Sequence, residues 1–533
     1  MNNQVQQQDN QQARHAAFHF SALIMLLALA SLACSIGVLT PSDPLFAAPP
    51  ALESGTVTPI MVFATAVPDA VTATPEPVQA VSAGGLPSAP TMDPNTSPIL
   101  YYTQAGDTLP VVAVRFGVDP SEINSPEPLS PTNLLHPNQL MIIPHRLANT
   151  TSNIKILPDS EVVFSPSAVE LDINAFVNQA GGYLSTYRDW LGTTHWTSGA
   201  EIIYRIALEN SINPRLLLAL LEYQSGWVYG QPTNLALLDY PMGKVGLSSK
   251  GLYPQLAWAV NFISTGYYGW REGLITEIQF RDGVIARLAP DLNAGTVALQ
   301  YYLAQIYTTQ QWVQALDPTT GIPALYERMF GSPWVRALEV EPLYPPDLQQ
   351  PDMILPFFVG QMWAFTGGPH GAWETEGARA ALDFSPAREQ SGCVESNAWI
   401  LAMAAGQVVR SGNGVVVLDL DGDGLEQTGW ALMYLHVENE GRVALGTWVE
   451  TGDLIGHPSC EGGRATGTHV HIARKYNGEW IPAYGPLPFI LDGWVTFGGR
   501  EPYQGSLVRD GQTVYASQVG SFESRIIRQR SNP

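Results

Sequence analysis

Basic residues are scarce in this sequence. It holds 26 Lys and Arg against 48 Asp and Glu, which gives a formal net charge of −22 over 533 residues. A protein that binds nucleic acid needs a basic face to neutralise phosphates, so this balance argues against a nucleic-acid partner. Charged residues of both signs make up only 14% of the chain, while Thr, Ser, Gly and Pro are abundant. This composition is typical of an extracellular protein that binds or acts on polymers.

Cysteine is also scarce, and one of the three cysteines, Cys34, lies in an apolar run from Phe20 to Leu39. The run is long enough to cross a membrane once as a helix, and it also fits a signal peptide. Ser31-Leu32-Ala33 before Cys34 resembles a bacterial lipoprotein cleavage site, although the usual Leu three positions before the cysteine is missing. Residues 1–40 are therefore expected to be a cleaved signal, a membrane anchor or a lipidation site. Each of these exports the rest of the chain to the cell envelope or beyond.

The length of the chain exceeds what a single hydrophobic core usually supports, so several domains are expected. Residues 41–97 are rich in Pro, Ala, Thr and Ser without a hydrophobic period, which predicts an extended linker. Cys393 and Cys460 lie in the exported part, where an oxidising compartment allows them to pair. Two buried free thiols are the alternative.

Residues 98–147 have the pattern of a small βααβ unit. Strands at 100–103 and 139–143 flank a helix near 109–116 and a second helix around 120–124. The distinctive short motifs are Gly106-Asp107-Thr108-Leu109, Phe116-Gly117-Val118, Ile123-Asn124, Pro137-Asn138-Gln139-Leu140 and Ile143-Pro144.

Through these motifs the unit resembles a LysM domain. The resemblance implies binding of glycans that contain N-acetylglucosamine, such as those of peptidoglycan, and we expect Gly106, Asp107 and Thr108 to contact the glycan. A spacer of the same fold without a ligand is the alternative, because such motifs indicate a fold better than they indicate binding.

Residues 160–350 are expected to be mainly helical. Ser198 is a candidate N-cap, and Pro214 opens the helix in "INPRLLLALLEYQSGW". This stretch resembles the helix that carries the catalytic glutamate of lysozyme-like lytic transglycosylases, but Gln224 stands where those proteins have the acid. An amide has no proton to give to a glycosidic oxygen, and Glu222 lies roughly 200° away around the helix. We therefore expect an inactive domain that holds glycan or is purely structural.

Residues 354–510 change to short strands with Gly-rich turns, which predicts a mainly β domain of antiparallel sheet or barrel-sandwich type. Five of the ten histidines lie between positions 370 and 471. His469 and His471 are two apart and would share one side of a strand. A catalytic zinc commonly has three protein ligands, often two His and one carboxylate, with a fourth position left for water. The candidate set is His370, Asp383, His436, His469 and His471.

This set resembles that of the lysostaphin-type peptidoglycan metalloendopeptidases, through His370 and Asp383, Tyr434-Leu435-His436 and His469-Val470-His471. The thirteen-residue step from His370 to Asp383 and the two cysteines resemble the staphylolysin (beta-lytic) branch. The resemblance implies one zinc ion bound by His370, Asp383 and His471, catalytic roles for His436 and His469, and a disulfide between Cys393 and Cys460. Taken singly, each of these residues could be an ordinary turn or strand residue.

Two further features are expected to be structural. His457 matches no ligand position. Asp419, Asp421 and Asp423 imitate a calcium loop, but the twelfth position is Trp430 instead of Glu. A hairpin turn with solvated carboxylates is the preferred interpretation.

The leading hypothesis is an exported zinc endopeptidase that cuts the peptide cross-links of peptidoglycan while the LysM unit holds the glycan. A non-catalytic wall-binding scaffold that activates other hydrolases is the second hypothesis, and a glycan-cleaving enzyme based on Glu222 is the third. Residues 146–350 could also restrain activity by covering the substrate groove. Residues 511–533 are expected to be a tail, contact with a membrane is expected only through the N-terminal segment, and the oligomeric state is left open.

Overall fold

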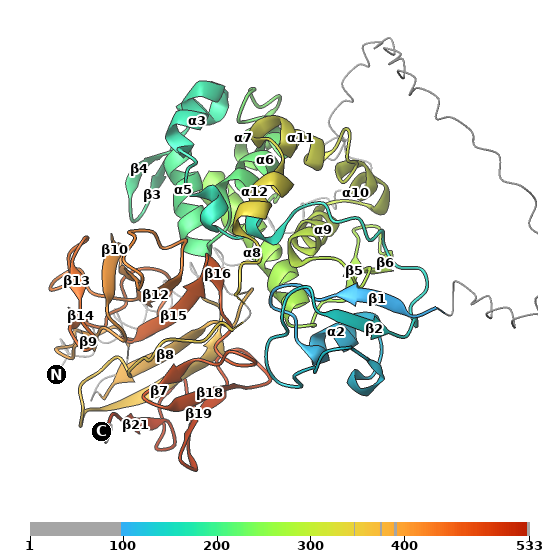
Figure 1. Ribbon diagram of the computed structural model, residues 1–533. Coiled ribbons are helices and arrows are strands. Elements are labelled where there is room, and N and C mark those ends of the chain that lie inside the picture. The colour runs from blue at the N-terminus through green and yellow to red at the C-terminus, as the bar shows by residue number, and fades with distance from the viewer. Residues whose placement is uncertain (1–96, 346, 374–375, 388–391, 530–533) are drawn as a thin grey trace, which may run out of the picture. The chain divides into compact units, whose positions relative to one another are not determined.

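The computed structural model describes residues 97–345, 347–373, 376–387 and 392–529 (Figure 1). The predictions for residues 1–40 and for the linker up to residue 96 lie outside the described residues. Within the described ranges, no helix is long and apolar enough to cross a membrane.

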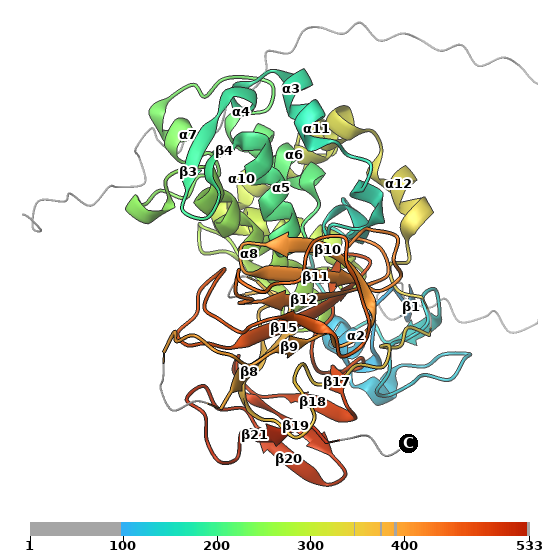
Figure 2. The ribbon, with the colours of Figure 1, turned by 90° about the vertical axis from the view of Figure 1, so that its left-hand side faces the viewer.

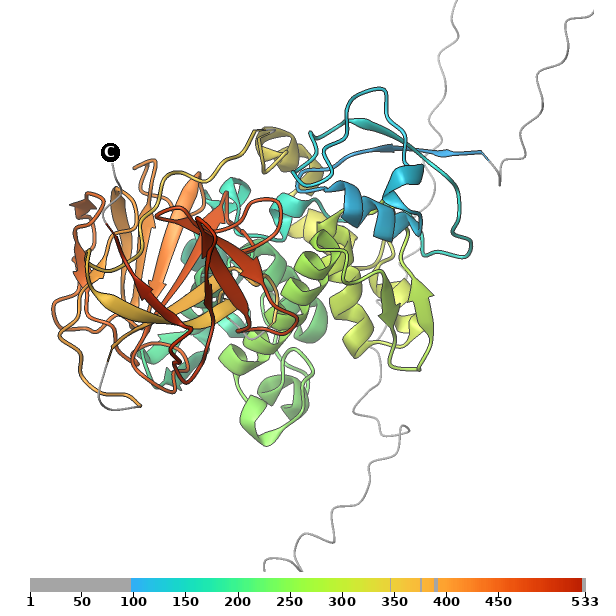
Figure 3. The ribbon, with the colours of Figure 1, turned by 90° about the horizontal axis from the view of Figure 1, so that it is seen from below.

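The N-terminal module contains β1 (Ile99–Tyr102), α2 (Leu109–Phe116) and β2 (Leu140–Ile143), and the two strands pair antiparallel. The helix α2 ends because Gly117 adopts the left-handed conformation, with φ of 66°. The second predicted helix is only a 3-10 turn, η3 (Pro120–Glu122), because the chain then becomes extended and Asn124 forms a bridge with Ile142 of β2. The module, blue in Figure 3, is tied to the helical region by Arg115, which donates to the Trp270 carbonyl.

The middle of the chain is a helical region, as predicted. The helix α5 begins with a capping box formed by Ser198 and Glu201, and Pro214 occupies the first turn of α6. Two small hairpins interrupt the helices. The elements are η4 (Asp159–Glu161), η5 (Pro166–Ala168), α3 (Ile173–Ala180), α4 (Tyr183–Thr186), β3 (Arg188–Leu191), β4 (His195–Ser198), α5 (Gly199–Asn210), α6 (Pro214–Ser225), α7 (Leu235–Asp239), η6 (Leu247–Ser249), α8 (Leu252–Arg271), β5 (Glu277–Gln279), β6 (Ile285–Arg287), α9 (Ala294–Ile306), α10 (Thr309–Ala315), α11 (Ile322–Phe330) and α12 (Pro333–Val340).

The C-terminal region is built on a nine-stranded antiparallel sheet in the order β13-β10-β11-β12-β15-β8-β7-β21, with β16 paired to β15 (Figure 2). A four-stranded sheet, β17-β18-β19-β20, and the pair β14-β9 accompany it. The strands are β7 (Met362–His370), β8 (Ala381–Pro386), β9 (Ile400–Leu401), β10 (Gly406–Gly412), β11 (Val415–Asp419), β12 (Trp430–Leu435), β13 (Trp448–Val449), β14 (Leu454–Gly456), β15 (Val470–Tyr476), β16 (Glu479–Trp480), β17 (Ile490–Leu491), β18 (Trp494–Gly498), β19 (Gly505–Arg509), β20 (Gln512–Tyr515) and β21 (Arg525–Ile527).

The two faces of the large sheet belong to different hydrophobic cores, because side chains alternate along each strand. One face shares a core with the smaller sheet and includes Leu382, Leu432 and Ile472. The other face, called here the helix-side face, shares one continuous core with the helical region. The helix-side face consists of Ala381, Val415, Val417, Ala431, Met433, Leu435 and Ala473.

The expectation of a C-terminal tail at 511–533 is wrong for most of that segment. β20 pairs with β19, and β21 pairs with β7, with Ile526 opposite Trp363. Ile526 is buried in the core of the sheet. The polar composition of residues 511–533 hides this packing role from the sequence.

Candidate metal centre

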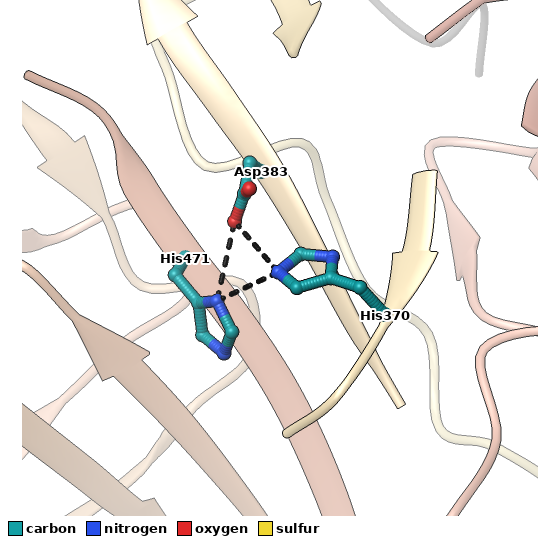
Figure 4. Close-up of side chains that lie close together, drawn as sticks. All are labelled: His370, Asp383 and His471. Atoms are coloured by element: carbon teal, nitrogen blue, oxygen red, sulfur yellow. Dashed lines mark hydrogen bonds and ion pairs between the residues drawn. The ribbon is translucent and has the colours of Figure 1, made fainter. Parts of the chain in front are cut away.

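Three neighbouring strands bring His370, Asp383 and His471 together (Figure 4). Asp383 in β8 lies directly opposite His471 in β15, and His370 is the last residue of β7 on the other side of β8. Gly367 in β7 lets the carboxylate approach, since a Cβ atom at that position would lie 2.3 Å from Asp383 Oδ2. Residues 101 positions apart in the chain therefore meet through sheet register.

The three side chains direct one atom each to a common point. His370 Nε2 lies 3.1 Å from His471 Nδ1 and 3.3 Å from Asp383 Oδ1, and His471 Nδ1 lies 3.2 Å from the same oxygen. All three residues are buried, with 3%, 7% and 6% exposure for His370, Asp383 and His471. Asp383 Oδ1 has no hydrogen-bond donor among the described residues.

The outer nitrogens fix the tautomers of both imidazoles. His370 Nδ1 donates to the Gly368 carbonyl at 2.8 Å, and His471 Nε2 donates to the Ala372 carbonyl at 2.9 Å. In a neutral imidazole the other nitrogen then carries a lone pair. When both imidazoles are neutral, two lone pairs and one carboxylate oxygen converge, which is an arrangement that attracts a cation.

Zn²⁺ fits this set of donors. Bonds of 2.0–2.2 Å in a tetrahedral site place ligand atoms about 3.3–3.6 Å apart, and the observed separations are 3.1–3.3 Å. Two nitrogens and one oxygen are ligands that zinc accepts, and three protein ligands leave one position of a tetrahedron open.

The charges at this site also favour a cation. Burial alone would lower the pKa of His370, but the Asp383 carboxylate beside it raises that pKa above its ordinary value. Burial likewise acts to raise the pKa of Asp383, and the surrounding imidazoles overcome it and hold the pKa well below its usual range. The carboxylate therefore stays ionised and stabilises positive charge at this point.

His436 and His469 lie beside this centre. Their rings are 4.5 Å apart, and His469 Nε2 lies 3.7 Å from Asp383 Oδ1. Each donates its Nδ1 proton to a backbone carbonyl, His436 to Glu461 at 2.9 Å and His469 to Gly467 at 2.7 Å. Burial, followed by the neighbouring imidazoles, lowers the pKa of His436 to about 3. In both rings Nε2 is the nitrogen left free to exchange a proton.

A disulfide joins Cys393 and Cys460 next to these two histidines. Cys460 precedes Glu461, the partner of His436. On the other side, the Thr468 amide donates to the Gly392 carbonyl, and the Thr468 hydroxyl accepts a hydrogen bond from the Val394 amide. Because Thr468 precedes His469, the disulfide connects the segments that orient both imidazoles.

Sequence reasoning missed Tyr503. Its ring stacks on the His370 imidazole, with centroids 4.1 Å apart and planes at 21°. Burial, then the charge of Asp383, raises the pKa of the Tyr503 hydroxyl. The residue lies 32 positions after His471 in a Gly-rich turn, and its local sequence carries no signal that could have placed it here.

The three expected glycan contacts lie in the N-terminal module, where Asp107 is buried. Its carboxylate accepts hydrogen bonds from Arg115 at 2.7 Å and from the Tyr101 hydroxyl at 2.5 Å. A Cβ atom at Gly106 would lie 2.6 Å from Arg271 Nη1 of the helical region, and Thr108 is buried. Asp107 thus stabilises the fold of the module. The glycan contacts of Gly106, Asp107 and Thr108 stay a prediction.

The helical region places Glu222 and Gln224 in different surroundings. Glu222 accepts hydrogen bonds from the amides of Val228 and Tyr229, just beyond the end of α6. The Gln224 side chain instead accepts a hydrogen bond from the Tyr307 hydroxyl. This geometry ties Glu222 to the turn after its helix.

The other two motifs have structural surroundings. His457 donates to the Ala398 carbonyl and packs against Trp399. In the hairpin loop, both oxygens of buried Asp419 accept backbone N–H groups, from Asp421 and from Gly424, as expected for a turn. Burial, followed by the neighbouring carboxylates, raises the pKa of Asp421 to about 6.

Comparison with known proteins adds sequence relatives. Residues 155–345 match a family model described as LasA, N-terminal domain. The chain is 25% identical over 344 residues to Protease LasA from two strains of Pseudomonas aeruginosa, and the match covers 62% of this chain and 75% of LasA. These matches support a LasA-like peptidase, and the lysozyme-like and LysM resemblances stay predictions.

Solved structures match parts of this chain. The M23 metalloprotease pseudoalterin is 23% identical over 31% of this chain and 96% of its own, with a TM-score of 0.27. The catalytic domain of lysostaphin from Staphylococcus simulans is 21% identical over 23% of this chain and 87% of its own, with a TM-score of 0.17. These scores are too low to carry an argument about activity.

Proposed function

We propose that this protein is a zinc-dependent endopeptidase of the cell wall that cleaves peptide bonds in the cross-links of peptidoglycan. The observation that carries the proposal is the convergence of His370 Nε2, Asp383 Oδ1 and His471 Nδ1 within 3.3 Å of one another. The sequence likeness to Protease LasA supports a protease independently of this geometry.

His370, Asp383 and His471 would hold the zinc ion. When bound, zinc polarises the scissile carbonyl and lowers the pKa of an attacking water toward neutrality. The backbone carbonyls of Gly368 and Ala372 keep the two ligand imidazoles in the required tautomer.

His436 and His469 would handle protons during the reaction. Their Nδ1 atoms are engaged by carbonyls, so Nε2 of each ring is the atom that accepts a proton from the nucleophile or gives one to the leaving amine. A ring that has gained a proton on Nε2 would also stabilise negative charge that develops on the substrate oxygen.

The N-terminal module would hold the glycan strand near the protease, as a LysM domain does. Its paired strands β1 and β2 with α2 between them support this assignment. We place the protein outside the cell, because a substrate in the wall and a disulfide both require export. The helical region is proposed as non-catalytic, since Gln224 cannot act as an acid and Glu222 is bound to the turn after α6.

Digestion of purified sacculi tests the function. The full-length protein should release soluble peptide fragments that mass spectrometry identifies by their new amino termini, and a zinc chelator should stop the release. An Asp383→Asn variant serves as the control for contaminating hydrolases. Protein that binds sacculi, carries zinc and still releases no fragments would instead favour the wall-binding scaffold.

A further inference from the structure

The four-stranded sheet of the C-terminal region has one buried face and one face that reaches solvent. Thr496 in β18, Leu507 in β19 and Val514 in β20 lie opposite one another and are 1%, 0% and 7% exposed. Side chains alternate along a strand, so the neighbours of these residues project to the opposite side. This opposite side, called here the outer face, consists of Val495, Phe497, Ser506, Val508, Thr513 and Tyr515.

Phe497 and Tyr515 form a row of aromatic side chains across the outer face. Phe497 lies directly opposite Ser506, and Ser506 lies directly opposite Tyr515. The two aromatic residues are therefore two strand spacings apart, roughly 10 Å. Phe497 and Tyr515 are 52% and 55% exposed. A single exposed apolar residue is ordinary on a protein surface, but two aromatic rings in register on one sheet face provide two aligned surfaces for stacking.

This row lies at the end of the sheet that is next to the candidate metal centre. The turn between β18 and β19 carries Tyr503, whose ring stacks on the His370 imidazole. The Tyr503 amide also donates to the carbonyl of Pro369 at 3.2 Å, and β18 and β19 lie next to β7 (Figure 2). Only one further pair of residues separates Phe497 and Ser506 from this turn. A ligand on the row is thus close to His370.

The outer face suits a sugar polymer better than a protein partner. Its six side chains are all uncharged, and they are far fewer than the roughly 20–30 residues that each side of a stable protein interface uses. A pyranose ring presents apolar C–H groups on its faces and hydroxyl groups around its rim. Aromatic rings cover such apolar faces, and the hydroxyls of Ser506 and Thr513 can exchange hydrogen bonds with the rim. In an extended β-linked glycan, every second sugar recurs at a distance similar to the spacing of the two aromatic residues.

We propose that the row formed by Phe497, Ser506 and Tyr515 binds the glycan strand of peptidoglycan during cleavage. The strand then lies beside His370, and the peptide attached to the same strand is held close to the metal centre. Holding one part of a substrate raises the effective concentration of the part linked to it. The proposal rests on the proposed function for its consequence in cleavage, whereas binding of a β-linked glycan to the row needs no reaction. The enzyme should prefer peptides that are still attached to glycan.

Comparison of two substrates tests the row. The first is a soluble peptidoglycan oligomer with cross-linked peptides, and the second is the same peptides after an amidase has removed the glycan. In the full-length protein, Phe497→Ala combined with Tyr515→Ala should lower kcat/KM for the oligomer about tenfold, because two stacking contacts are lost. The value for the free peptides should stay unchanged. Phe497→Trp should keep the wild-type value on both substrates, since it retains an aromatic ring.

The matched control is Trp448→Ala. Trp448 is exposed to a similar degree but belongs to β13 at the other edge of the large sheet, so its loss should affect neither substrate. An equal loss of kcat/KM on both substrates in the double variant would show that the row binds peptide, and no loss on either would show that it binds neither. Both results overturn the proposal. Should the double variant fail to fold, as judged by circular dichroism, the two single variants are compared in the same way.

Fluorine NMR measures glycan binding without catalysis. The full-length protein is labelled with para-fluorophenylalanine, and the resonance that is missing from Phe497→Ala belongs to Phe497. Addition of the β-linked tetramer of N-acetylglucosamine should shift this resonance in the wild type, and the shift should need a higher tetramer concentration in Tyr515→Ala. A resonance that does not move overturns the proposal. If no form of the protein cleaves peptide, the proposed function fails, and the NMR shift alone decides the glycan contact.

Discussion

The backbone carbonyl of Glu461 accepts a hydrogen bond from His436 Nδ1 at 2.9 Å, and Glu461 directly follows a disulfide-bonded cysteine. His436 itself adopts a left-handed backbone conformation with φ of 66°, which is uncommon for a residue other than Gly. The disulfide fixes the segment that carries the Glu461 carbonyl, and this carbonyl orients the imidazole. The same contacts support the unfavourable left-handed backbone conformation of His436.

Removal of the disulfide should therefore reduce catalysis more than metal binding. We expect Cys393→Ser combined with Cys460→Ser to lower the rate of sacculus digestion at least tenfold, because the carbonyl partners of His436 and His469 lose their anchor. Zinc content should stay near one per chain. Closing a loop of 67 residues also contributes about 4 kcal/mol to stability in the chain-entropy account, so the assay is run well below the melting temperature. Loss of zinc together with activity would contradict this division.

Replacement of a ligand should remove the metal. Asp383→Asn keeps the shape of the side chain but loses the charge that stabilises a cation, so zinc affinity should fall by more than about 100-fold, beyond the effect typical of an outer partner. Metal analysis of the dialysed protein gives the stoichiometry. His457→Ala is the matched control, because His457 bonds to Ala398 away from the centre and its loss should leave zinc in place. Equal zinc content in the Asp383→Asn and His457→Ala variants would show that Asp383 is not a ligand.

His469→Ala should separate chemistry from metal binding. Its Nε2 lies near Asp383 but outside the group of three converging atoms, so zinc should remain while kcat falls by about 10²–10⁴, the usual contribution of a general acid or base. The measurement pairs metal analysis with the rate of fragment release. A variant that retains more than half of the wild-type rate would exclude a catalytic role for this imidazole.

Stability should depend on pH through Glu341. Burial, followed by the charge of Asp159, raises the pKa of this carboxyl to about 7, compared with about 4.5 in the unfolded chain. The folded state therefore binds the proton more tightly. The resulting stabilisation is fully present below about pH 4.5 and is lost as the pH rises through about 7, and after allowance for solvent it is of the order of 2 kcal/mol.

Urea unfolding at pH 5 and pH 8 measures this effect in wild type and in Glu341→Gln. The glutamine cannot ionise and keeps the oxygen that accepts the Ser160 amide, so the variant should be the more stable protein at pH 8. Glu440→Gln, at an exposed position, should follow the wild type. The same pH dependence in all three proteins would show that Glu341 is not responsible.

The candidate residues of the site could be named from the sequence by their types and by a family resemblance, and their roles stay a prediction; the structure brings His370, Asp383 and His471 together. His469 and His471 are two apart at the start of a strand, and His370 and Asp383 flank a loop of small and polar residues. The capping box of Ser198 and Glu201 gave the start of α5 for a similar local reason. The capping box and the His469–His471 pair are local signals, whereas the meeting of His370, Asp383 and His471 depends on the register of β7, β8 and β15.

The remaining features depend on contacts between distant segments. Tyr503 reaches His370 only through the fold, and Asp107 is buried by Arg115 and Tyr101 instead of facing solvent. The second predicted helix of the N-terminal module is only a 3-10 turn because Asn124 forms a backbone bridge with Ile142 of β2. In each case tertiary pairing outweighs the local preference, which a single sequence does not reveal.

The pairing of β21 with β7 has a consequence for assembly. β7 is nine residues long and ends at His370, and without β21 it would be the last strand of the large sheet. Without β21, the residues Met362–Ala364 at the start of β7 would offer free amides and carbonyls to any extended peptide, including another copy of the chain. The three residues Arg525–Ile527 therefore protect the end of β7 that lies away from His370, and a protein shortened before them should be prone to edge-to-edge self-association through Met362–Ala364.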